Sequence, residues 1–73
     1  MNPANLIKMA NQIGAFFEAM PNREQAVKDI AVHIQKNWDP RMRTALHNHI
    51  SNCGDVELSP MVREALLLVQ NVS

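Results

Sequence analysis

The residues with the most potential for chemistry lie at "WDPRMR", residues 38–43, where the only tryptophan precedes two arginines. Asp39 followed by Pro40 predicts a helix start, because Asp caps free backbone amides and Pro suits the first helical turn. A helix start is the positive end of the helix dipole, which disfavours Arg41 and Arg43 by about 0.3–1 kcal/mol each. Tryptophan and arginine are enriched in interface hot spots, and guanidinium groups bind carboxylates and phosphates. An anionic or carboxylate-bearing partner would stabilise this arrangement.

A structural interpretation of the same stretch stays open. Trp38 continues the apolar stripe of the preceding predicted helix and would then fill the turn between two helices. Arg41 and Arg43 diverge by about 160° at 100° per residue, so one shared anion is not assured. In this interpretation they form a solvated surface that pairs with nearby carboxylates. The candidates are Glu18, Glu24 and Asp29.

Three histidines and one cysteine raise the question of a metal site. His47 and His49 are two residues apart, so on a helix they diverge by about 160° and do not share an ion. His49 falls on an apolar face, where a buried histidine is expected, and His47 falls on a more exposed flank one turn after Arg43. Cys53 falls on the same apolar face and is expected to be buried and inert. We expect no metal and no redox cofactor in this chain.

The sequence also disfavours catalysis, nucleic-acid binding and membrane insertion. It contains no nucleophile with an adjacent base, no glycine-rich phosphate loop and no close carboxylate pair. Seven basic and seven acidic side chains give zero net charge, unlike a general nucleic-acid binder. No apolar run approaches the roughly 20 residues that cross a bilayer, and the start lacks the features of a signal peptide. We expect a soluble, cytoplasmic, non-enzymatic protein.

The elements that must position these residues are all predicted to be helical. Apolar residues recur at helical spacing, no alternation with a period of two is present, and Pro, Asn, Asp and Gly separate the segments. We predict an all-α, single-domain bundle over residues 1–73. Its four helices should span about 3–20, 23–37, 40–53 and 60–72. Its core should contain Ile13, Phe16, Phe17, Ile30, Ile34, Leu46, Ile50 and Leu66.

The two glycines have different predicted roles. Gly14 falls at the edge of the first apolar face, inside a helix, where glycine costs about 1 kcal/mol relative to alanine. Close approach by another helix would offset that cost, but the sequence favours the simpler interpretation that this glycine has no packing role. Gly54 follows the third helix at the position where a left-handed residue ends it.

The last predicted helix has more apolar surface than one neighbouring helix covers. Its apolar residues span an arc of about 160°, and Leu67 lies on the opposite side. Either the helix is the central core element, or its extra face belongs to a partner. Part of that face would then stay exposed in the free domain and favour self-association. The face comprises Met61, Leu67, Leu68 and Val72, which join Trp38, Arg41, Arg43 and His47 as candidate partner-binding residues.

A family resemblance is carried by three segments, "MANQIGAFFEAMP", "AVKDIAVHIQKNWDPRMRTALHNHI" and "ELSPMVREAL". They are similar to the small delta subunit of soluble, NAD-dependent, molybdenum-containing formate dehydrogenases. The similarity runs from about Leu6 to Leu66, and its most specific parts are "NQI..FF", "IA.HI..NWDPRMR" and "LSP.V..AL". The family often has Phe-Trp where this chain has Asn37-Trp38, so the packing around residue 37 differs from the family pattern.

The resemblance implies an accessory role for this chain. It implies that larger subunits carry bis-molybdopterin guanine dinucleotide, the iron–sulfur clusters, FMN and the NAD site, whereas the delta subunit carries none of them. The delta subunit would support assembly or stability, with the large catalytic subunit as its partner. An alternative is a small helical module that binds a nucleotide or molybdopterin phosphate at Arg41 and Arg43 during cofactor insertion, with Trp38 stacking on a base.

Overall fold

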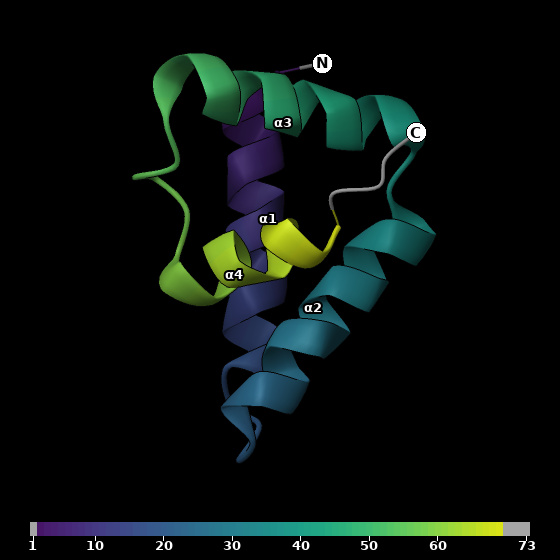
Figure 1. The fold of residues 1–73 in the computed structure, drawn as a ribbon, viewed down its shortest axis with the longest axis vertical. Helices are drawn as coiled ribbons and strands as arrows, with labels where there is room; N and C mark the ends of the chain where they lie inside the picture. The colour runs from purple at the N-terminus through teal and green to yellow at the C-terminus, as the bar shows by residue number, and fades with distance from the viewer. Residues whose placement is uncertain (1, 70–73) are drawn as a thin grey trace.

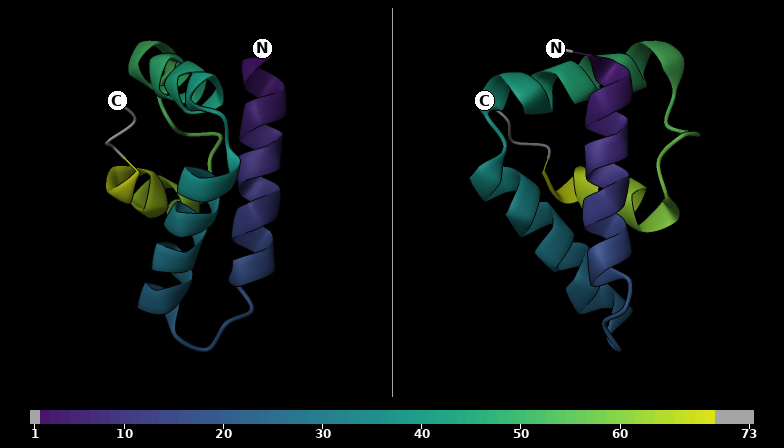
Figure 2. Two further views of the ribbon diagram at one scale, coloured as in Figure 1. Left: turned by 90° about the vertical axis from the view of Figure 1, so that its right-hand side faces the viewer. Right: turned by 180° about the vertical axis from the view of Figure 1, so that it is seen from behind.

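The computed structural model describes residues 2–69, which form four α-helices. They are α1 (Pro3–Phe17), α2 (Arg23–Asn37), α3 (Pro40–Cys53) and α4 (Pro60–Leu68). The described residues contain no strand, so the all-α prediction is confirmed. α1 and α2 form a hairpin, α3 crosses its open end, and α4 lies across the hairpin (Figure 1). In the side view of Figure 2, α1 forms one side of the domain and the end of α4 forms the other.

The helices begin at the residues that the sequence predicts. Side-chain oxygens of Asn2, Asn22 and Asp39 accept hydrogen bonds from backbone N–H groups in the turn that follows each of them. Ser59 makes no side-chain cap, yet α4 still begins at Pro60. Proline has the φ angle of a helix and no N–H to satisfy, so it defines this start without a capping hydrogen bond.

The first helix ends earlier than predicted. α1 ends at Phe17 rather than near Met20, because Pro21 disfavours the helical conformation in the residues that lead up to it. α4 ends at Leu68, and Val69 closes it with a tighter turn. The predicted extension to Val72 lies outside the described residues.

The end of α3 confirms one prediction and corrects another. Gly54 has a φ angle of 89°, which L side chains rarely adopt, so glycine ends the helix as predicted. Cys53 is exposed, whereas the apolar pattern placed it in the core. The reason is position along the helix, because α3 extends beyond the core after Ile50, which itself is only partly buried.

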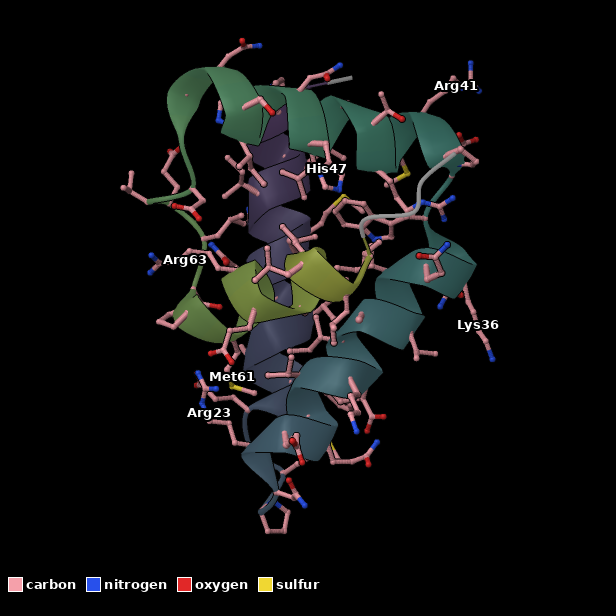
Figure 3. The ribbon with its side chains drawn as sticks, in the orientation of Figure 1. Arg23, Lys36, Arg41, His47, Met61 and Arg63 are labelled. Atoms are coloured by element: carbon pink, nitrogen blue, oxygen red, sulfur yellow. The ribbon has the colours of Figure 1, made fainter. Side chains whose placement is uncertain are left out.

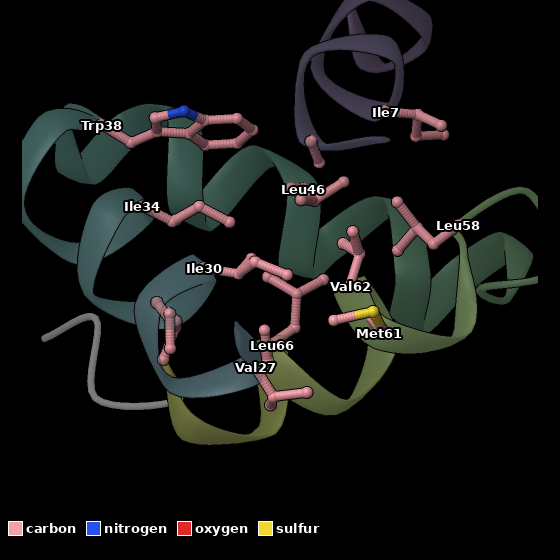
Figure 4. Packing of buried hydrophobic residues seen from close by; sticks show 14 of the residues in the cluster. Ile7, Val27, Ile30, Ile34, Trp38, Leu46, Leu58, Met61, Val62 and Leu66 are labelled. Atoms are coloured by element: carbon pink, nitrogen blue, oxygen red, sulfur yellow. The ribbon is translucent and has the colours of Figure 1, made fainter. Parts of the chain in front are cut away.

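The core forms where α4 packs against α1 and α2, and Leu46 of α3 joins the same cluster, as the close view in Figure 4 shows. Four of the predicted core residues are buried, namely Ile30, Ile34, Leu46 and Leu66. Three more, Ile13, Phe17 and Ile50, are partly buried and pack against this cluster.

Phe16 is the predicted core residue that the structure places outside, with 76% of its surface exposed. α1 buries Leu6, Ala10 and Gly14 on one side. Residue 16 is about 200° from residue 14 at 100° per residue, so it points away from that side. The packing of α1 on α2, α3 and α4 therefore sets the rotation of α1 and exposes this ring.

Gly14 allows α4 to approach α1 closely. A Cβ at residue 14 would lie 2.6 Å from Cγ2 of Val62 and 3.3 Å from Oγ of Ser59. Val62 is fully buried, so its methyl group has no free space to enter. The close helix approach that offsets the cost of an interior glycine is therefore present.

Two polar contacts also hold α4 in place. The Nδ2 of Asn11 donates to the Glu57 carbonyl oxygen, and its Oδ1 accepts from the Ser59 backbone N–H, both at 2.9 Å. One amide side chain on α1 thus fixes the segment that leads into α4. Arg23 and Glu64 form an ion pair between α2 and α4, and the hydrogen bond from Arg23 lowers the pKa of the Glu64 carboxyl. Since both side chains are exposed, this pair contributes little to stability.

Replacing Gly14 by Ala should destabilise the domain, although alanine is the better helix former. The added methyl group overlaps Val62, and overpacking of this kind costs about 1–3 kcal/mol, against about 1 kcal/mol gained in helix propensity. Urea denaturation should show a lower free energy of unfolding. In a double-mutant cycle, Val62→Ala should relieve part of the loss in the Gly14→Ala background. A Gly14→Ala variant more stable than the wild type would contradict the close contact.

Candidate protein-docking surfaces

The turn between α2 and α3 uses its tryptophan and one arginine internally. Trp38 is buried, which supports the structural interpretation of this side chain. Arg43 is also buried, and its Nη1 donates to the carbonyl oxygens of Gln35 at 2.7 Å and Trp38 at 3.1 Å. These carbonyls lie at the C-terminal end of α2, where backbone acceptors lack helical partners and the dipole is negative. The positive charge of Arg43 is unfavourable at the start of α3, the positive end of that helix dipole, but favourable at the end of α2, which is negative.

The two arginines therefore have separate environments. Arg41 is exposed, and its Nε lies 3.6 Å from Oδ1 of Asp39. The same oxygen accepts the backbone N–H of Arg41 at 2.8 Å, which is the main cause of the lowered pKa of the Asp39 carboxyl. The expectation that Arg43 belongs to a solvated surface is wrong, because the side chain is buried and its Nη1 bonds two carbonyl oxygens at the end of α2. Among the described residues, neither arginine pairs with the three carboxylates predicted from sequence.

The histidines do not converge. His47 and His49 are half-buried, and the Nε2 of each is enclosed without a hydrogen-bond partner among the described residues. Figure 3 shows His47 on the side of α3 that faces the other helices, which corrects its predicted exposed position. The Nε2 of His49 lies 3.6 Å from Oε1 of Glu57. Within residues 2–69, no three His, Cys, Asp or Glu side chains group as a metal site. The absence of a metal stays a prediction.

The predicted apolar patch of the last helix exists in part. Leu67 and Leu68 are 72% and 54% exposed. Met61 is buried instead, because it starts α4 beside the α1–α2 turn, near Met20 and Arg23. Val72 lies outside the described residues. Leu68 borders a shallow hollow of about 350 Å³ between α2 and α4. The hollow is lined by Lys28, Ala31, Val32, Gln35, Lys36 and Leu68.

A second hollow, which we call the α1–α3 groove, was not predicted from the sequence. It has a volume of about 520 Å³ and lies between α1, α2 and α3. Phe16 stands at this groove, edge-to-face with Phe17 at 5.1 Å between ring centroids, and Phe17 in turn meets the edge of the His33 ring. No lining residue is an acid, a lysine or an arginine. The lining comprises Met9, Gln12, Ile13, Phe16, Phe17, His33, Asn37, Trp38 and Met42.

Two features of the sequence bear on this groove. Adjacent aromatic residues on a helix point about 100° apart, so Phe16 and Phe17 were unlikely candidates to share one core. Asn37, where the resembling family often has Phe, lines the groove, and its Nδ2 donates to the His33 carbonyl oxygen at 2.9 Å. The departure from the family pattern is therefore at the groove and leaves the core intact.

The described part of the chain is a small helical domain that buries Trp38 and Arg43 and leaves apolar side chains exposed on two faces. None of the helices in residues 2–69 has the length and apolar content to span a bilayer. Exposed apolar side chains that gather on a face are typical of surfaces that contact other molecules.

The chain belongs to the FdsD family, described as the NADH-dependent formate dehydrogenase delta subunit, which matches residues 5–66. It is thus a small subunit of an oxidoreductase complex, as the resemblance of its three sequence segments predicts. Searches of curated proteins and of solved structures gave no significant match.

Arg43 and Arg41 should differ sharply in their contribution to stability. Arg43→Met removes two charge-assisted hydrogen bonds, one buried and one part-buried, so we expect a loss of about 2–4 kcal/mol in the free energy of unfolding. Arg41→Met should change it by less than about 0.5 kcal/mol, since that side chain is exposed. Denaturant unfolding of both variants measures the difference. Equal, small effects would show that Arg43 does not hold the end of α2.

Proposed function

We propose that this chain is a non-catalytic accessory subunit that supports assembly or stability of its formate dehydrogenase complex. The observation that carries the proposal is Phe16, a ring 76% exposed at the α1–α3 groove. Burying an aromatic side chain of this size stabilises by about 1.5–3 kcal/mol. Contact with another subunit would supply that burial, because the domain itself does not.

The groove favours the apolar face of a helix from another subunit. In helix-in-groove recognition an amphipathic helix lays its apolar face into a hydrophobic groove, and the mainly apolar lining contributed by α1, α2 and α3 suits such a face. Met9 and Met42 lie in the lining, and methionine side chains adapt readily to the shape of a partner. We propose the large catalytic subunit as the partner. The molybdopterin, iron–sulfur, FMN and NAD sites of the complex belong to its larger subunits in this proposal.

The alternative function, binding of a nucleotide or molybdopterin phosphate, needs Arg41 and Arg43 to act together. Arg43 is buried and bonded to two backbone carbonyls, whereas Arg41 is exposed beside Asp39. Trp38 is buried as well and offers no free face for a base. These contacts favour protein docking over the nucleotide hypothesis.

Phe16→Glu should weaken incorporation into the complex while the free domain stays folded. Because the ring is exposed, its removal leaves no internal cavity, but it removes the apolar contact and places a charge in a neutral groove. A hot-spot aromatic is worth at least about 2 kcal/mol, so we expect about 30-fold weaker binding. The measurement is the amount of this chain that co-purifies with a tagged catalytic subunit.

Val56→Glu is the matched control, because Val56 is 82% exposed on the α3–α4 link, outside the groove. It should be incorporated as the wild type is. Circular dichroism confirms that both variants fold. If Phe16→Glu and Val56→Glu are incorporated equally well, the groove is not the docking site.

A further inference from the structure

We infer that a second surface, the α2–α4 face, binds a carboxylate-bearing apolar segment of another subunit of the same complex. The face is defined by Lys28, Val32 and Lys36 on α2 and Leu68 on α4. The inference rests on the proposed function, since it concerns how an accessory subunit is held in its complex.

The geometry of the face alternates charge and apolar surface along one line. Lys28, Val32 and Lys36 are four residues apart, so they follow one another along the same side of α2. Val32 is 48% exposed and Leu68 is 54% exposed, and both line the same hollow of about 350 Å³. A partner side chain that enters the hollow meets apolar atoms in the middle and an ammonium group toward either end.

The positive charge of this face is not neutralised within the domain. Among the described residues, neither lysine lies within ion-pair distance of a carboxylate, and the hollow is lined by two lysines and no acid. Nearby Glu64 is already paired with Arg23. Glu24 lies one turn before Lys28, so the excess charge is greatest toward Lys36. The negative end of the α2 dipole favours Lys36 in the last turn, but it does not account for Lys28.

Charge complementarity identifies the chemistry of the partner. Carboxylates on either side of an apolar residue would pair with the two ammonium groups while that residue fills the hollow. The α1–α3 groove differs because its lining is neutral. The two faces therefore accept different segments and give the docked subunit a defined orientation.

A second copy of this chain is the main competitor, because it has a segment with this chemistry. The α3–α4 link contains Asp55, Val56 and Glu57, and Val56 is 82% exposed. However, the link lies at the opposite edge of the domain from Lys36, as Figures 1 and 3 show. Copies joined in this way would be related head to tail, a contact that forms rings or open chains rather than a simple dimer. We therefore assign the face to a different subunit.

The test uses the full chain added back to a formate dehydrogenase complex purified without it. The variants are Lys28→Glu, Lys36→Glu and the double variant, and the matched control is Lys8→Glu on α1, which is exposed and lines neither hollow. We expect the double variant to bind about tenfold more weakly, because like charges then meet at the interface. Raising the salt from about 0.05 M to about 0.5 M should weaken wild-type binding and have less effect on the double variant.

Carbodiimide cross-linking, which joins an amine to a carboxylate in direct contact, locates the partner segment. We expect links from Lys28 or Lys36 to an Asp or Glu of another subunit. Binding of the double variant equal to that of Lys8→Glu, or links from Lys8 alone, would overturn the inference. Links from Lys36 to Asp55 or Glu57 of a second copy, lost on dilution, would assign the face to self-association instead.

If the wild-type chain does not bind the complex at all, the proposed function itself fails. If Phe16→Glu weakens binding and the lysine variants do not, only this inference fails.

Discussion

The structure depends on the packing of one short helix against two longer ones. α4 has nine residues, and four of them, Met61, Val62, Ala65 and Leu66, are buried. An isolated helix of that length is not stable in water, so α4 owes its conformation to its neighbours. The absence of a side chain at Gly14 lets α4 come close to α1, and Asn11 fixes the segment that leads into it. The position of α4, together with α2 and α3, in turn decides which side of α1 is buried.

A domain of 73 residues with a single cysteine has few means of stabilisation beyond a small core. Two polar side chains supply part of what a disulfide would otherwise contribute. Each makes two hydrogen bonds to backbone groups, Asn11 to the α3–α4 link and Arg43 to the end of α2. Both bonds of Arg43 come from Nη1 and reach carbonyl oxygens at the end of α2, where the helix dipole favours a positive charge. Residue types common in binding sites are thus used here to hold turns together.

Features that depend on residues close in the chain, such as helix starts, are predictable from the sequence. Features that depend on contacts between distant segments, such as which side of a helix is buried, are not. Caps and prolines lie within a few residues of the helix starts that they define, so all four starts were predictable. The choice between Phe16 and Phe17 depends on the rotation of α1, which is set by its packing on α2, α3 and α4. The role of Arg43 was equally hidden, because its dipole conflict in α3 is visible in the sequence whereas its hydrogen bonds to α2 require the turn geometry. Exposure of Leu67 was predictable because it lies opposite the apolar arc of its own helix.

The exposed apolar residues follow from the size of the domain. The four described helices enclose one core, in which α4 packs on α1 and α2. The side of α1 that carries Phe16 and the end of α4 therefore have no described element to cover them. Moving Phe16 inward would require α1 to rotate and to bring a side chain against Val62 where Gly14 now lies. The same packing that makes the core close around α4 therefore leaves Phe16 outside. In the proposed complex, other subunits bury these apolar side chains. The α1–α3 groove would supply apolar contact, and the lysines of the α2–α4 face would restrict the orientation in which that contact forms.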